Sequence, residues 1–106
     1  MSDAERRERA FLLHGFADYV ALEQGLSPRT QEAYRRDLLR FAEYAAAKGA
    51  AAPPDVTARL LREYVYHLKD LGLSPASIRR NVSAIRTWFR FLTGDGIVVR
   101  DPSERL

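Results

Sequence analysis

Arginine and hydroxyl side chains gather along two stretches of this 106-residue chain, and each stretch opens with Gly-Leu-Ser-Pro. The first, from Gly25, reads GLSPRTQEAYRRDLLRF, and the second, from Gly72, reads GLSPASIRRNVSAIRTWF. Guanidinium and hydroxyl groups contact phosphate oxygens and base edges, but they do not by themselves break covalent bonds. The chemistry that these residue types offer is therefore the binding of a polyanion.

The positive charge of the chain lies on these two stretches. Its net charge of +3 comes from 17 Lys and Arg against 14 Asp and Glu. Residues 25–49 hold five basic and three acidic side chains, and residues 72–96 hold four basic and one acidic. The remaining segments are neutral, except for residues 1–24, which are acidic. An unopposed basic face on a small helical domain suits nucleic acid, because each phosphate contact releases counterions.

Helical spacing places the arginines of each stretch on one face. At about 100° per residue, four polar side chains of the second stretch fall together, and Arg80 lies further round the same side. These four are Arg79, Ser83, Arg86 and Arg90. The corresponding face of the first stretch consists of Arg29, Arg36 and Arg40, with Arg35 to one side. Because Glu32 and Glu43 are within reach of Arg36, a solvated, ion-paired face remains an alternative for the first stretch.

The elements that must position these residues are helices. Apolar residues recur at helical spacing in four segments, and no segment alternates as a strand would. We expect helices at roughly residues 3–24, 27–49, 56–71 and 75–92. The linker AAAPPD, residues 50–55, is too short to separate two domains. The expected fold is all-α, a four-helix bundle of two packed helical hairpins, with residues 1–106 as one domain. Its acidic first helix should face away from a polyanion.

Each Gly-Leu-Ser-Pro copy has the composition of a helix end followed by a helix start. Glycine accepts the positive φ of a helix C-terminus, serine is a good N-cap, and proline suits the first helical turn. Thr30 and Ser77 occupy the same place in the two copies. The free backbone N–H groups of a helix N-terminus can also bind phosphate, so this second use stays open.

Other chemistry has little support in the composition. There is no cysteine, and neither His14 nor His67 has partners at metal-ligand spacing, so no metal or cofactor is expected. No apolar run reaches the roughly 18 residues of a membrane span, and the N-terminus lacks a signal-peptide pattern, so we expect a cytoplasmic protein. Trp88 and Phe91 should extend the core, although base stacking and a partner surface remain open alternatives.

Three motifs stand in order along the chain. They are LSPRTQEAYRRDLLRFAEY, then, after a third helix, LSPASIRRNVSAIRTWFRFL, and finally GIVVRDPSERL. From about Phe11 onward, the ordered set resembles the N-terminal core-binding domain of tyrosine site-specific recombinases, the phage-integrase family, and most closely the Xer type. In that family the domain is a four-helix, SAM-like bundle that forms half of a C-shaped clamp on duplex DNA. Its second and fourth helices lie against the major groove.

The resemblance implies DNA contacts at nine positions. They are Arg29, Thr30, Arg35, Arg36, Ser77, Arg79, Arg80, Ser83 and Arg86. The charge pattern adds Arg40 and Arg90 as DNA-binding candidates. Two departures are mild: Ser77 stands where the family often has threonine, and Asp101-Pro102 where it often has Asn-Pro. The first keeps the hydroxyl, and the second alters the exit turn.

The resemblance also implies that the chain itself is not an enzyme. Family members cut DNA with a nucleophilic tyrosine and an Arg/His-rich set, including an H-x-x-R stretch, in a C-terminal domain, and neither histidine here is followed by that pattern. We therefore expect residues 97–106 to start a linker to a catalytic domain of the same parent recombinase. The implied partners are the double-stranded DNA of a recombination site, that catalytic domain and further recombinase protomers in a tetrameric synaptic complex.

Two rival functions remain open. One is a stand-alone helical DNA-binding regulator, and the other is a helical protein-interaction module whose arginines meet an acidic partner. A reading frame that continues past Leu106 into a recombinase catalytic domain would exclude the first. A steep salt dependence of duplex binding would argue against the second.

Overall fold

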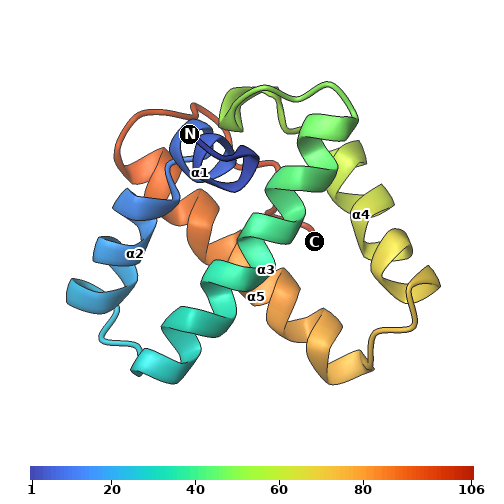
Figure 1. Ribbon diagram of the computed structural model, residues 1–106, viewed down its shortest axis with the longest axis horizontal. Coiled ribbons are helices and arrows are strands. Elements are labelled where there is room, and N and C mark those ends of the chain that lie inside the picture. The colour runs from blue at the N-terminus through green and yellow to red at the C-terminus, as the bar shows by residue number, and fades with distance from the viewer.

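Five α-helices and one 3-10 turn make up the fold of the computed structural model, which describes residues 1–106. The elements are α1 Asp3–Ala10, α2 Leu13–Leu22, α3 Pro28–Ala47, η1 Pro53–Asp55, α4 Ala58–Asp70 and α5 Pro75–Gly94. The expected all-α class is confirmed. In Figure 1, α3 and α5 cross at the centre, α2 and α4 lie on the two flanks, and α1 lies at the end opposite the α2–α3 and α4–α5 turns. The two hairpins are thus α2–α3 and α4–α5.

The single first helix expected over residues 3–24 is wrong, because the helix breaks into α1 and α2 at Leu12. Leu12 has a positive φ of 59°, in the left-handed region. Its neighbours Phe11 and Leu13 are both buried, at 1% and 5% exposed. In a continuous helix these two side chains would point about 200° apart. The break lets both reach the core.

Aromatic rings at the crossing of α3, α4 and α5 form the centre of the core. The Phe41 ring lies 5.0 Å from that of Tyr64 and 5.9 Å from that of Trp88, between centroids. All three side chains are fully buried. Phe91 is also buried, 6.1 Å from the Phe16 ring. Of the alternatives left open for Trp88 and Phe91, core packing is therefore correct, and base stacking is not.

Residues 97–106 form turns that pack back on the bundle. Val98 and Ser103 are buried, and Leu106 packs against the core. One carboxylate oxygen of Asp101 accepts hydrogen bonds from the backbone N–H of Ser103 at 2.8 Å and from its hydroxyl at 2.6 Å. Asp101-Pro102 thus closes a compact turn. That this segment leads into a linker stays a prediction.

Candidate nucleic-acid interface

The two Gly-Leu-Ser-Pro turns have the same local structure. Gly25 and Gly72 have φ values of 61° and 84°, which only glycine adopts without strain. The hydroxyl of Ser27 caps α3 by accepting from the N–H of Thr30 at 3.2 Å. The hydroxyl of Ser74 caps α5 in the same way, through the N–H of Ser77 at 3.1 Å. The helix-stop, helix-start interpretation is therefore confirmed. Figure 1 shows both turns, and hence the N-termini of α3 and α5, at the same edge of the molecule.

An open groove of about 450 Å³ lies between the N-terminal halves of α3 and α5. It is lined by Arg29, Thr30, Ala33, Tyr34, Arg36, Arg80 and Ser83. Five of these seven side chains belong to the eleven that the sequence nominated for DNA contact. The groove thus joins the two repeat-derived helices into one surface, with three arginines around it.

Arg80 is bound to a buried carboxylate that sequence analysis missed. Its Nε donates to one oxygen of Asp37 at 2.7 Å, and its Nη2 donates to the other at 2.9 Å. Asp37 lies on α3 and is 5% exposed, whereas the Arg80 side chain is 41% exposed. The hydrogen bond to Asp37, opposed by partial burial, raises the pKa of the Arg80 guanidinium. The pair ties the two hairpins together beside the groove.

Most of the other arginines predicted to bind DNA form no ion pair. No carboxylate lies within 4.0 Å of Arg29, Arg36, Arg40, Arg79, Arg86 or Arg90. All six are exposed. The ion pairs considered for Arg36 are absent, because Glu32 instead lies 3.7 Å from Arg35. The ion pairs of this alternative are therefore absent at Arg36 and Arg40, and DNA contact by the first stretch stays a prediction.

Arg35 lies on a different side of α3 and reaches α1. Its Nη2 donates to Glu8 at 2.8 Å, and Glu8 is only 9% exposed. The exposed His14 ring lies 3.3 Å from the other Glu8 oxygen. Arg35 thus supports the packing of α1 on α3, outside the groove. A DNA role for Arg35 stays a prediction with this competing contact.

The hydroxyl side chains differ in their freedom. Thr30 and Ser77 each accept a 3.1 Å hydrogen bond from the capping serine of their own turn, Ser27 and Ser74. Both are half-buried at the first turn of their helices. Ser83 is exposed and has no intramolecular partner. It is the most accessible of the three for a phosphate.

His67 packs among tyrosine rings on α3 and α4. The His67 ring packs 4.9 Å from that of Tyr44 and 6.1 Å from that of Tyr64. Burial raises the pKa of Tyr64, and burial with nearby Glu63 raises that of Tyr44. No three His, Asp or Glu side chains are grouped to hold a metal ion. None of the helices has the length and apolar composition of a membrane span.

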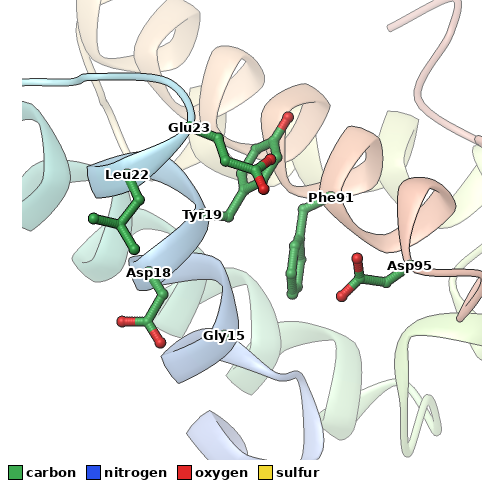
Figure 2. A pocket seen from close by; sticks show the side chains of 7 residues that line it. All are labelled: Gly15, Asp18, Tyr19, Leu22, Glu23, Phe91 and Asp95. Atoms are coloured by element: carbon green, nitrogen blue, oxygen red, sulfur yellow. The ribbon is translucent and has the colours of Figure 1, made fainter.

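A second hollow, of about 200 Å³, lies between α2 and α5 and has the opposite charge. Figure 2 shows the carboxylates of Asp18, Glu23 and Asp95 around it, with the Phe91 ring on the α5 side. None of these acids is in an ion pair. Such a hollow repels phosphate, in contrast to the groove between α3 and α5.

Comparison with known proteins places residues 13–96 in one family. They match the family described as "Phage integrase, N-terminal SAM-like domain". Curated proteins similar to this chain include Tyrosine recombinase XerC of Roseiflexus castenholzii, 36% identical over 89% of this chain and 30% of that protein. Tyrosine recombinase XerD of Bradyrhizobium diazoefficiens is 39% identical over 83% of this chain and 27% of that protein. Tyrosine recombinase XerD of Oceanobacillus iheyensis is 34% identical over 88% and 32%, respectively. The chain thus spans less than a third of each relative. No solved structure matches it.

Proposed function

Since the chain belongs to the phage integrase N-terminal SAM-like domain family, we propose that it is the DNA-binding N-terminal domain of a tyrosine site-specific recombinase. In this proposal it holds duplex DNA through α3 and α5 during recombination or integration. The observation that carries it is the groove between these two helices, which collects five of the eleven nominated side chains.

Charge supports the proposal. Arg29 and Arg36 line the groove and have no acidic partner, so both guanidinium groups are available for phosphate oxygens. Arg79, Arg86 and Arg90 extend the free cations along the exposed face of α5. Guanidinium groups bind phosphate bidentately, and each neutralised phosphate adds to affinity through counterion release.

The position of the N-termini of α3 and α5 adds to this charge. Both helices begin at the same edge of the molecule, as Figure 1 shows. A helix N-terminus carries a partial positive charge and unbonded N–H groups, both of which favour a nearby phosphate. The N–H groups of Arg29 and Ala76 have no backbone acceptor. The N–H of Arg29 belongs to a residue that lines the groove, so it would supplement the arginines there.

The proposal extends to a larger parent. Because the chain spans only 27–32% of three similar recombinases, cleavage and rejoining of DNA strands would belong to a catalytic domain outside it. Residues 97–106 would lead into the linker. The remaining partners would be a recombination site and further protomers in a tetrameric synapse. A protein acting on such DNA would work in the cytoplasm.

Titration of a labelled duplex of random sequence tests the proposal. We expect affinity to fall steeply between about 50 and 200 mM salt. Arg36→Ala should weaken binding. Arg9→Ala is the matched control, since Arg9 is an exposed arginine of α1 without an ion pair, and it should leave binding nearly unchanged.

Three results would overturn the proposal: no duplex binding at low salt, no salt dependence, or equal effects of the two variants. If the chain instead binds an acidic protein through the same arginines, the interaction-module alternative is favoured.

A further inference from the structure

The contact between Asp37 and Arg80 places a carboxylate beneath a surface that is otherwise basic. Asp37 is 5% exposed, and both of its oxygens accept hydrogen bonds from Arg80. Arg80 itself lines the groove between α3 and α5 together with Arg29 and Arg36. A negative charge at this position lowers the affinity of the groove for any polyanion. Affinity alone therefore does not account for it.

The geometry of the pair leaves one edge of the guanidinium free. Arginine has five N–H donors, and Asp37 takes one from Nε and one from Nη2. Three donors remain, two on Nη1 and one on Nη2. One of them on each Nη nitrogen points to the outer edge of the guanidinium, and such a pair can donate bidentately to O6 and N7 of guanine. The side chain is 41% exposed, so this edge is accessible from the groove.

Arg80 differs in this respect from the other arginines of the groove. Arg29 and Arg36 have no side-chain partner, so each can adopt any of several rotamers in which it contacts a phosphate. Arg80 is held in one orientation before any ligand arrives. Fixing a side chain in its bound conformation reduces the entropy lost on binding and sharpens discrimination between correct and incorrect partners.

We infer that Asp37 is a positioning residue, which holds Arg80 so that its free guanidinium edge reads a guanine in the major groove. This inference rests on the proposed function and adds a division of roles within the groove. Arg80 supplies sequence preference, and the unheld arginines supply affinity for any duplex. Asp37 touches no DNA and acts only through Arg80.

Asp37→Asn tests the inference, because it removes the charge and keeps the shape. The native chain first selects a preferred sequence from a pool of randomised short duplexes. The affinities of native and variant chains are then measured for that duplex and for a shuffled one. We expect Asp37→Asn to bind the shuffled duplex at least as tightly as the native chain does, since one repulsive charge is gone. The ratio of the affinity for the selected duplex to that for the shuffled duplex should fall about fivefold or more, as expected for a lost bidentate base contact. A merely structural role would weaken binding to both duplexes alike.

Two further variants complete the design. Arg80→Lys keeps the positive charge but lacks the two-donor edge of the guanidinium. Its preference for the selected duplex should therefore fall as much as that of Asp37→Asn. The variant that combines Asp37→Asn with Arg80→Lys should show no greater loss of sequence preference than either single variant. The matched control is Glu8→Gln, which removes another buried acid that binds an arginine of α3, outside the groove. Glu8→Gln should leave the ratio of affinities for the selected and the shuffled duplex unchanged. Circular dichroism verifies that each variant is folded, and if Asp37→Asn unfolds, Arg80→Lys alone decides.

The outcomes separate this inference from the proposed function. Failure of the native chain to bind any duplex would overturn both. Binding with no selectable preference, or a preference that survives Asp37→Asn or Arg80→Lys in a folded chain, would overturn the positioning role alone.

Discussion

Trp88 of α5 donates a 3.1 Å hydrogen bond from its indole Nε1 to the backbone oxygen of Phe11, where the N-terminal helical segment breaks. Both side chains are buried, and their rings lie 6.1 Å apart. A helix break inside a protein leaves carbonyl groups without their usual partners, and a buried one must be paired elsewhere. The indole thus stabilises the turn between α1 and α2 through a contact between residues 77 positions apart in the sequence.

Trp88→Phe should therefore destabilise the fold. The change removes the donor, leaves the Phe11 oxygen buried without a partner and opens a cavity beside Phe41. We expect a loss of about 2–4 kcal/mol in the free energy of unfolding. Urea unfolding followed by circular dichroism measures it. Tyr66→Phe is the control, since Tyr66 is exposed and should change stability little. If Trp88→Phe loses no more free energy of unfolding than Tyr66→Phe does, the hydrogen bond of the indole is unimportant for stability.

The repeated glycines give a second stability prediction. Gly72 has a φ of 84°, so Gly72→Ala should cost about 1 kcal/mol through backbone strain, although a methyl group would meet no atom there. Gly94, also without neighbours, has no positive φ, and Gly94→Ala should raise stability by about 0.5 kcal/mol. Thermal melts of the two variants should shift in opposite directions. Equal shifts would contradict the conformational explanation.

Helix starts were predictable because their cause is local. Ser27 and Ser74 bind N–H groups only three residues away, so four letters of sequence contain the whole interaction. The helical spacing of Tyr34, Leu38, Phe41 and Ala45 predicts one apolar face, of which the last three are buried and Tyr34 is half-buried. Hydroxyl caps and apolar spacing therefore predicted both hairpins and the two helices that border the groove.

The break at Leu12 was not predictable, because its cause is distant. The spacing of residues 3–24 is compatible with one continuous helix, and the compensating donor is 77 residues away from Phe11. The Asp37–Arg80 contact was missed for a similar reason, since it spans 43 residues. One local sign existed: Asp37 adjoins Leu38 and lies four residues before Phe41, on the buried face of its helix. An acid at such a position needs a buried partner.

The first helix provides a prediction that separates charge from structure. Glu5 of α1 is exposed and has no ion pair, so Glu5→Lys should change duplex affinity little if α1 faces away from DNA. Glu8→Lys should instead destabilise the chain by about 1–3 kcal/mol, because it breaks the contact with Arg35 and buries a second cation there. Anisotropy titrations and urea unfolding measure the two effects. A tighter complex for Glu5→Lys, comparable to the loss caused by Arg36→Ala, would place α1 near the DNA.

No tyrosine of this chain should form a covalent bond with DNA. Burial holds the pKa of Tyr64 above its usual value, and the exposed Tyr66 has the ammonium of Lys69 5.2 Å from its ring centre. Incubation with a nicked duplex that traps 3′-phosphotyrosine intermediates should yield no slow-migrating adduct in a denaturing gel. An adduct that disappears in any single Tyr→Phe variant would show that the chain carries a nucleophile.

Arg86 should contribute affinity without sequence preference. It is exposed, has no acidic partner and lies on the face of α5 that it shares with Arg79 and Arg90, outside the groove lining. An unheld arginine on this face suits a phosphate, which is the same in every sequence. Arg86→Ala should therefore weaken binding to the preferred and the shuffled duplex by the same factor. It should also reduce the slope of log affinity against log salt by about 0.9, the contribution of one phosphate contact.

Arg80→Ala is the comparison, since it should reduce the difference in affinity between the preferred and the shuffled duplex. If the two variants have indistinguishable effects on both duplexes, the division between held and free arginines is wrong. If neither changes binding, the basic face of α5 is solvated and the contact with DNA lies elsewhere.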